Sequence, residues 1–179
     1  MGMRTLHLLR HAKSSWDDVS LDDHDRPLSK RGRRSAEAVA EHFRKEPVAI
    51  EWVLGSTALR VRETVEPLLA VLKPSRILFD RKLYLARSAT LLDQLRRVDD
   101  GIAAVLLVGH NPGLHELALA LAEARSLDAL PPITGKFPTG ALASFEIAAS
   151  WRRVVPGGAK LLSYRSPRDF ATADSTGKT

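Results

Sequence analysis

The sequence contains no cysteine, which excludes disulfide bonds and thiolate metal ligands. Aromatic residues make up only 6% of the chain, and there is neither a zinc-finger spacing nor an aromatic RNA-binding signature, so we expect no nucleic-acid partner. No apolar run approaches the roughly 20 residues that span a bilayer. The amino terminus leads directly into a strand-like segment and does not resemble a signal peptide. These absences predict a cytoplasmic protein without membrane attachment.

The residues that are present are typical of a globular domain. The chain has 179 residues, of which 44% are hydrophobic and 27% charged, enough for one domain with a sizeable core. The net charge of +6 suits anionic partners such as phosphates or acidic proteins. The positive excess is spread along the chain except for one cluster, Lys30-Arg31-Gly32-Arg33-Arg34.

Strand-like and helix-like segments alternate along the chain. Strands are predicted at residues 4–9, 52–54, 76–79, 103–108, 142–147 and 160–164, the last two paired antiparallel. Helices are predicted from the capping residue Ser29 to residue 43 and at residues 58–72, 90–98 and 113–124, with a kink or break at Pro67. The alternation favours one α/β domain over residues 1–166, in three α/β/α layers, with a mostly parallel central sheet and an antiparallel edge. Residues 167–179 are expected to form a polar, flexible tail.

Four polar segments follow predicted strands or begin predicted helices. They are Leu9-Arg10-His11-Ala12, Ser56-Thr57-Ala58-Leu59-Arg60, Val108-Gly109-His110-Asn111-Pro112-Gly113 and Pro138-Thr139-Gly140-Ala141. In a parallel sheet, segments that follow strands converge on one edge even when they are far apart in the sequence. We therefore expect one pocket that contains two arginines and two histidines: Arg10, Arg60, His11 and His110.

This set of residues suits a phosphoryl group. It lacks carboxylates and makes a poor metal site, whereas guanidinium groups bind phosphate oxygens in pairs and a neutral imidazole is a competent nucleophile at phosphorus. His110 precedes a tight turn into a helix N-terminus, which is a good anion site, with a simple capping histidine as the alternative. The remaining histidines, and Arg62, are interpreted as structural or surface residues: His7, His24, His42 and His115.

Four motifs in order resemble those of the histidine phosphatase (phosphoglycerate mutase-like) superfamily. They are Leu8-Leu9-Arg10-His11-Ala12-Lys13-Ser14, Arg26-Pro27-Leu28-Ser29-Lys30-Arg31-Gly32, Ser56-Thr57-Ala58-Leu59-Arg60-Val61-Arg62-Glu63-Thr64 and Val108-Gly109-His110-Asn111-Pro112. Together they span residues 4 to about 147. The short chain and the Arg-Pro-Leu-Ser element resemble the SixA-type phosphohistidine phosphatase branch.

The resemblance implies a phosphoglycerate mutase-like fold and a mechanism. His11 would attack phosphorus in line and become a phosphohistidine intermediate, which water would hydrolyse. Arg10, Arg60 and His110 would hold the equatorial oxygens, with no metal or other cofactor. Further candidate substrate-binding residues from the same motifs are Lys13, Ser14 and Asn111. The expected substrate is a phosphohistidine protein, possibly an acidic one. A phosphatase of small-molecule phosphoesters and a non-catalytic phosphate-binding module remain as alternatives.

The chain departs from the family pattern at two places. Alanine stands at position 12, where the family usually has glycine. Larger members carry a carboxylate proton donor between the second and third of their motifs, but the corresponding stretch here, Leu83-Tyr84-Leu85-Ala86-Arg87-Ser88, has none. Asp23 is the first candidate for a general acid and Asp25 the second, with a solvated loop as the alternative. A missing donor favours a leaving group that is easily protonated, such as the imidazole of phosphohistidine.

The basic cluster lies in the first turn of the helix that Ser29 is expected to cap. Positive charge there opposes the helix macrodipole by about 0.3–1 kcal/mol per residue, which suggests a functional reason for it. We expect Arg33 and Arg34 to form a basic rim that binds an acidic phosphorylated protein, with a solvated helix face as the alternative. The oligomeric state cannot be predicted from the sequence.

Overall fold

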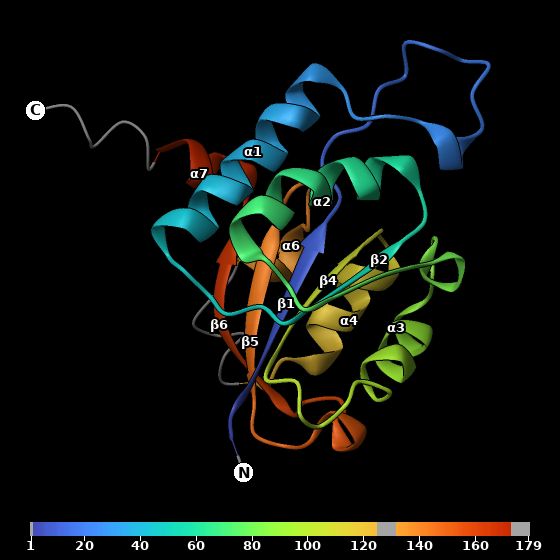
Figure 1. The fold of residues 1–179 in the computed structure, drawn as a ribbon. Helices are drawn as coiled ribbons and strands as arrows, with labels where there is room; N and C mark the ends of the chain where they lie inside the picture. The colour runs from blue at the N-terminus through green and yellow to red at the C-terminus, as the bar shows by residue number, and fades with distance from the viewer. Residues whose placement is uncertain (1, 125–131, 173–179) are drawn as a thin grey trace, which may run out of the picture.

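The computed structural model describes residues 2–124 and 132–172, and its centre is a six-stranded sheet in the order β3-β2-β4-β1-β5-β6 (Figure 1). The strands are β1 (Arg4–Arg10), β2 (Trp52–Ser56), β3 (Arg76–Asp80), β4 (Ala104–Gly109), β5 (Leu142–Ile147) and β6 (Ala159–Arg165). Strands β1 to β4 are mutually parallel, β5 is antiparallel to β1, and β6 is antiparallel to β5. The predicted mostly parallel sheet with an antiparallel edge is confirmed.

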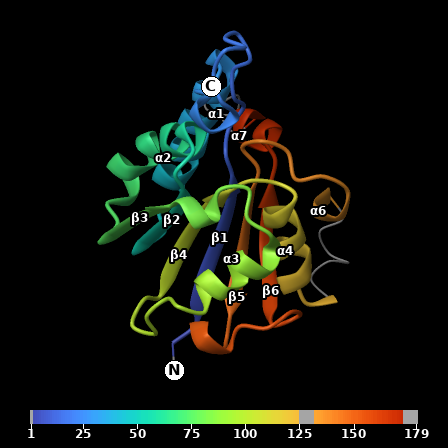
Figure 2. The ribbon, with the colours of Figure 1, turned by 90° about the vertical axis from the view of Figure 1, so that its right-hand side faces the viewer.

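Helices cover both faces of the sheet, and Figure 2 shows α2 and α4 on opposite sides of it. The helices are α1 (Lys30–Lys45), α2 (Leu59–Leu72), α3 (Ser88–Leu95), α4 (Gly113–Leu121), α6 (Pro132–Gly135) and α7 (Pro167–Thr172), with 3-10 turns η1 (Asp23–Asp25), η2 (Arg81–Leu83) and η3 (Trp151–Arg153). Along β4, Val105 and Leu107 pack with α3 and α4, whereas Leu106 and Val108 pack with α1 and α2. A central strand buried on both faces confirms the three layers.

The start of α1 fixes the chain that follows β1. Ser29 caps the helix as predicted, because its Oγ accepts a hydrogen bond from the Gly32 amide at 3.1 Å. Gly32 itself lies so close to Lys13 that any Cβ at this position would collide with the Lys13 carbonyl oxygen. The absence of a side chain therefore lets the first turn of α1 press against the segment that immediately follows His11.

The predicted break at Pro67 is wrong, because α2 runs continuously from Leu59 to Leu72, while the alternative of a kink stays a prediction. A proline inside a helix costs about 3 kcal/mol. On the inner side of α2, Val61, Val65 and Leu68 are completely buried, and burial of each such side chain stabilises the fold by about 1.5–3 kcal/mol. Packing of this apolar side therefore outweighs the local cost of the proline.

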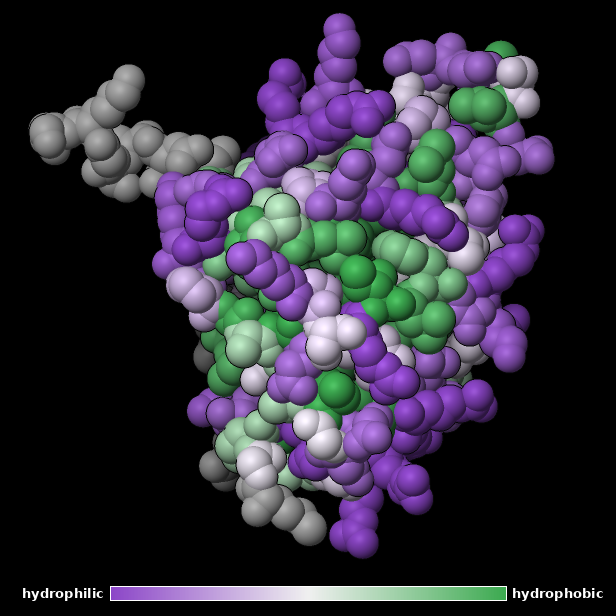
Figure 3. Space-filling view, viewed as in Figure 1, coloured by the Kyte–Doolittle hydropathy of each residue, from purple (hydrophilic) through white to green (hydrophobic). Residues whose placement is uncertain are grey.

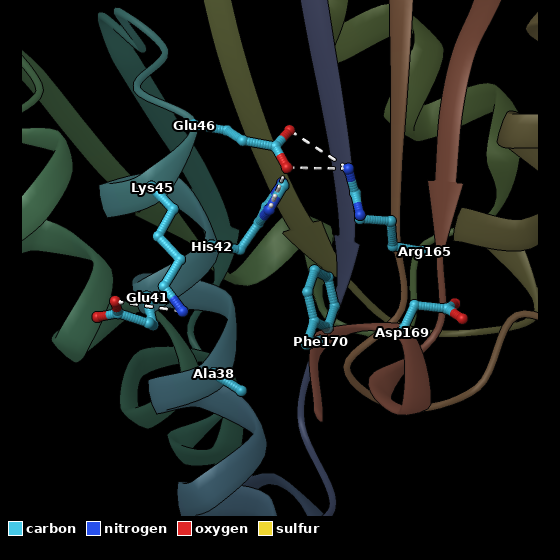
Figure 4. Close-up of a pocket in the computed structure, with 8 residues that line it drawn as sticks. All are labelled: Ala38, Glu41, His42, Lys45, Glu46, Arg165, Asp169 and Phe170. Atoms are coloured by element: carbon cyan, nitrogen blue, oxygen red, sulfur yellow. Dashed lines mark hydrogen bonds and ion pairs between the residues drawn. The ribbon is translucent and has the colours of Figure 1, made fainter. Parts of the chain in front are cut away.

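Residues Pro167–Thr172 of the predicted flexible tail form α7, and residues 173–179 lie outside the described part of the chain. Phe170 anchors this helix: it is buried, and its ring lies 5.3 Å from that of His42 on α1. Beside this contact is a small cavity of about 50 Å³. Figure 4 shows Glu46 at its edge, where it lies 3.6 Å from His42 and forms an ion pair with Arg165. A buried aromatic side chain thus packs this otherwise polar segment against the domain.

The surface has both apolar and strongly polar regions. Figure 3 shows apolar side chains gathered across the middle of one face, over and just below α2, with hydrophilic side chains around them. The edge strand β3 contributes to the apolar surface of the protein, since Ile77 is 46% and Leu78 is 37% exposed. Within the described residues, no helix combines the length and the apolar composition that crossing a bilayer would require.

Candidate active site

The two histidines of the predicted pocket follow neighbouring parallel strands. In the register of β1 and β4, Arg10 lies opposite Gly109, and the His11 amide donates a hydrogen bond to the Gly109 carbonyl at 3.1 Å. His11 and His110 therefore leave the same edge of the sheet side by side, with ring centroids 5.0 Å apart. The predicted convergence of these two segments is confirmed.

The third strand brings Arg60 to the same edge. Strand β2 ends at Ser56, α2 begins three residues later, and Arg60 lies in its first turn with only 4% of its surface exposed. The Ser56 Oγ lies 2.6 Å from Nε2 of His110, which ties the ends of β2 and β4 together. All four predicted residues line one cleft of about 420 Å³, in which Lys13, Ser14 and Asn111 also take part.

Hydrogen bonding fixes the tautomer of His11. Its Nδ1 lies 2.8 Å from the carbonyl oxygen of Ala12, which can only accept a hydrogen bond, so Nδ1 carries the proton. Burial, together with the Arg60 and Arg10 guanidiniums, lowers the pKa of His11 from 6.5 to about 4. At neutral pH the ring is therefore uncharged, and Nε2 is its unprotonated nitrogen, which is the form that can attack phosphorus.

His110 is also neutral in this arrangement. Burial, with His11 and Arg60 close by, lowers its pKa from 6.5 to about 3. Its Nδ1 lies 3.4 Å from an Arg60 nitrogen, which can only donate, so Nδ1 is the acceptor and Nε2 carries the proton that Ser56 accepts. The His110 Nδ1 is thus available to take up a proton when an anion balances the charge nearby.

One end of the Arg10 guanidinium is fixed by a hydrogen bond to the backbone. It donates to the Phe137 carbonyl at 2.9 Å, and the Asn111 side-chain amide donates to the same oxygen at 2.9 Å. Burial and the neighbouring Arg60 guanidinium lower the pKa of Arg10. Two like-charged guanidiniums in one cleft repel each other, and an anion bound between them would remove that repulsion.

Asp23 lies in the cleft and accepts hydrogen bonds from several donors. Its carboxylate accepts from the Tyr84 hydroxyl at 2.6 Å, from Arg60 at 2.9 Å and from Arg26 at 3.1 Å. The Tyr84 hydrogen bond, with the Arg60 and Arg26 charges, lowers the pKa of Asp23 despite partial burial. The other candidate acid, Asp25, is exposed and pairs with His24 at 2.8 Å, outside the residues that line the cleft.

Four residues of the site are not predicted from the sequence: Tyr84, Leu85, Arg26 and Trp16. Tyr84 lies in the stretch that lacks a carboxylate, and its ring centroid is 5.4 Å from that of His110. Arg26 is 5% exposed and reaches from the loop after β1 to Ser14 and Asp23. Trp16 lines the cleft and packs on Arg26. The sequence did contain a signal for Arg26, because it stands beside Pro27 in one of the four family motifs. For Tyr84 and Trp16 the sequence contained no signal of a site role, beyond their being aromatic residues outside the apolar runs.

The basic cluster lies apart from the cleft. Arg33 is exposed and pairs with Glu63 at 3.4 Å, and neither Arg33 nor Arg34 is among the residues that line the cleft. Glu63 also accepts a hydrogen bond from the Leu28 amide at 2.5 Å, which places a carboxylate beside the first turn of α1. This carboxylate offsets part of the unfavourable charge at the helix N-terminus.

Alanine at position 12 fits its place without strain. Positive φ angles at non-glycine positions occur, within the described residues, at Lys73 and Leu85 and not at Ala12. The Ala12 amide donates to the Thr64 hydroxyl at 3.0 Å, and its methyl group is completely buried. The departure from the family's glycine therefore leaves the local backbone intact. Among residues 2–124 and 132–172, no three histidine or carboxylate side chains come together as metal ligands.

Comparison with known sequences links the chain to one family. The family model described as histidine phosphatase superfamily (branch 1) matches residues 6–84. The protein Rv1276c of Mycobacterium tuberculosis is 38% identical over 162 residues, which cover 89% of this chain and all of the relative. A chloroplastic protein of Arabidopsis thaliana, At3g52155, is 36% identical over 131 residues, which cover 68% of this chain and 60% of that protein.

Solved structures agree with this assignment. A Nakamurella multipartitia protein described as a candidate SixA phosphohistidine phosphatase superposes with a TM-score of 0.81 and 29% identity, covering 93% of this chain and 98% of that one. The protein histidine phosphatase SixA, solved in complex with tungstate, gives a TM-score of 0.75 at 25% identity, covering 92% and 98%. These structures share the α/β fold of the present chain.

Proposed function

The chain belongs to the histidine phosphatase superfamily and is a phosphatase. We propose that it works through a covalent intermediate on His11 and that its substrate is a phosphohistidine protein. The observation that carries the proposal is the Nδ1 hydrogen bond of His11 to the Ala12 carbonyl at 2.8 Å. It presents an unprotonated Nε2 from a ring that lines a cleft with two arginines.

The reaction has two displacements at phosphorus. In the first, the lone pair of His11 Nε2 forms a bond to phosphorus while the bond to the leaving group breaks, and the leaving group takes a proton. In the second, water attacks the phosphorus, the P–Nε2 bond breaks, and inorganic phosphate is released. Arg10, Arg60 and His110 would hold the equatorial oxygens and stabilise the charge that they carry in each transition state.

The state of Asp23 supports the choice of substrate. Of the described residues that line the cleft, Asp23 is the one with a carboxyl group, so it is the candidate general acid. Its lowered pKa makes it a carboxylate at neutral pH and a weak source of protons. An imidazole leaving group can take its proton from solvent on the distal nitrogen, whereas a sugar or glycerol alkoxide cannot leave easily unprotonated. The cleft therefore favours a P–N bond.

The SixA structure was solved in complex with tungstate, a tetrahedral oxyanion like phosphate, which supports an oxyanion ligand for the present chain. We propose that no metal takes part here, since Arg10 and Arg60 supply the positive charge that a metal would otherwise bring. Activity that survives exhaustive treatment with a chelator would support this, and activity restored only by an added divalent ion would contradict it.

The test is to trap the phosphoenzyme. Brief incubation with a phosphohistidine protein or with phosphoramidate, followed by alkaline quenching, should yield intact protein heavier by one phosphoryl group, with the label on His11. His11→Ala should show neither label nor turnover. His42→Ala changes a partly buried histidine that does not line the cleft; this variant is the matched control and should behave as the wild type. Equal turnover of para-nitrophenyl phosphate by wild type and His11→Ala would overturn the mechanism.

The substrate class needs its own comparison. A panel of phosphohistidine proteins, sugar phosphates, nucleotides and aryl phosphates should give the highest kcat/KM for phosphohistidine. A preference for a small phosphoester would replace the proposed substrate but keep the mechanism. Tight phosphate binding without turnover of any member would indicate a non-catalytic binding module instead.

A further inference from the structure

Two exposed apolar side chains stand at the mouth of the cleft. Trp16 is 68% exposed and Leu85 is 51% exposed, and both line a cleft whose other walls are mostly charged or polar. The other tryptophans of the chain are buried, Trp52 at 8% and Trp151 at 0% exposure. Because leaving an indole in water forgoes the free energy of its burial, the position of Trp16 requires a reason.

The indole of Trp16 is held in place on one face. The guanidinium carbon of Arg26 lies 3.1 Å from the centre of the indole, and Arg26 is itself buried and bonded to the Ser15 carbonyl at 2.9 Å. The Ser15 amide in turn donates to the Pro27 carbonyl at 2.8 Å. Trp16 therefore follows a fixed backbone segment, with a cation under one face and most of its surface open to solvent. This is a preformed stacking surface.

The expected direction of displacement at phosphorus places the leaving group near this stacking surface. His11, Arg60 and His110 are 7%, 4% and 3% exposed, so the phosphoryl-binding end of the cleft is its buried end. In-line displacement places the attacking and leaving atoms on opposite sides of phosphorus. Attack by His11 from the buried end therefore directs the leaving group outward, to the mouth where Trp16 and Leu85 lie.

We propose that Trp16 and Leu85 form a subsite for a planar, ring-shaped leaving group, an inference that rests on the proposed hydrolase function. The imidazole of phosphohistidine is such a group, and so is a phenyl ring. A ring stacks on the open face of Trp16 against Leu85, whereas a polyol or sugar leaving group would put hydroxyls against these apolar side chains. The subsite thus selects the leaving group by shape, independently of the charge clamp on the phosphoryl group.

A matched pair of substrates tests the subsite. Phosphoimidazole and phosphoramidate both release their leaving group by breaking a P–N bond, but only the first releases a ring. Trp16→Ala should lower kcat/KM for phosphoimidazole by about 3- to 10-fold, the range expected for one aromatic contact, and leave phosphoramidate within about 2-fold. Trp16→Phe keeps a ring and should retain most of the selectivity. Leu85→Ala should reduce it in the same direction as Trp16→Ala.

Val19→Ala is the control for loss of an exposed apolar side chain, because Val19 is 93% exposed on the same loop and is not among the residues that line the cleft. It should leave both substrates unaffected. An equal loss on both substrates in Trp16→Ala would overturn the proposal, because Trp16 would then act only through Arg26. An unchanged rate on both would overturn it as well.

Binding of phosphonates separates this proposal from the proposed function. Phenylphosphonate should bind the wild type about 3- to 10-fold more tightly than methylphosphonate, and Trp16→Ala should lose that difference. If the wild type hydrolysed neither phosphoimidazole nor phosphoramidate, the proposed hydrolase function would be wrong. The difference in affinity between the two phosphonates would still show whether the subsite exists. Equal binding of the two phosphonates by the wild type would overturn the subsite alone.

Discussion

Arg60 donates a hydrogen bond to the Asp23 carboxylate at 2.9 Å, so one of the two arginines expected to hold the phosphoryl group is already paired with an acid. The pair is partly accessible to solvent, because the Arg60 side chain is only 4% exposed whereas the Asp23 side chain is 49% exposed. An incoming phosphate must therefore compete with Asp23 for the same guanidinium. We therefore predict that Asp23 weakens anion binding, in addition to being the candidate proton donor.

Replacement of Asp23 by asparagine should strengthen anion binding. The change removes a negative charge from the cleft and leaves Arg60 without its carboxylate partner, so inhibition by phosphate or tungstate should tighten by about 3- to 10-fold. Inhibition constants measured at constant ionic strength test this. Asp25→Asn, next to it but outside the cleft lining, is the control. Unchanged constants in Asp23→Asn would mean that Asp23 does not compete for Arg60.

The acid role of Asp23 is tested by leaving groups of graded basicity. If Asp23 donates the proton, Asp23→Asn should slow hydrolysis of alkyl phosphates far more than that of para-nitrophenyl phosphate, because only the poor leaving groups need the proton. The slope of log kcat/KM against the leaving-group pKa should therefore become steeper. A parallel shift of the line, or no shift, removes Asp23 from this role.

The pH dependence should report the neutral state of His11. Its pKa is lowered to about 4, so the nucleophile stays unprotonated down to that region and is lost only as the pH falls through it. After correction for substrate ionisation, kcat/KM should be flat from about pH 7 to pH 5 and fall below that. An acidic limb centred on the ordinary histidine value of 6.5 would contradict the neutral, buried His11.

Charge reversal in the basic cluster tests the rim that was predicted for a protein substrate. Arg33 and Arg34 lie outside the cleft, so the double change to glutamate should spare small substrates and raise KM for an acidic phosphoprotein severalfold. The salt dependence of that KM should also become weaker. If an aryl phosphate and the phosphoprotein respond alike, the cluster has no role in docking and is a solvated helix face.

The part of the site that follows from strand ends could be predicted from the sequence. Arg10-His11 and His110 follow apolar runs, and parallel strands bring their carboxyl ends to one edge, so the pattern alone places them together. Asp23 reaches the cleft from a short 3-10 turn, and Tyr84, 61 residues away, reaches Asp23 from the turn that follows η2; no periodicity relates the two residues. Their hydrogen bond depends on tertiary packing that local patterns do not encode.

Tertiary packing also decides local structure that the sequence pattern does not predict. Buried neighbours in α2 outweigh the unfavourable intrinsic preference of Pro67, and Phe170 of the polar α7 segment is buried against the domain. The exposed Trp16 has no periodic signal either, because its indole lies in a polar loop. Propensity rules fail where contacts between distant segments decide the outcome.

The Phe137 carbonyl accepts hydrogen bonds from both Arg10 and Asn111. The carbonyl of the preceding residue, Lys136, accepts a hydrogen bond from the Tyr164 hydroxyl at 2.6 Å. The antiparallel side of the sheet therefore supports the segment to which Arg10 is hydrogen-bonded. Tyr164 lies on β6 and is not among the residues that line the cleft, yet it binds the residue next to Phe137. The position of Arg10 in the cleft thus depends on a strand on which none of the four family motifs lies.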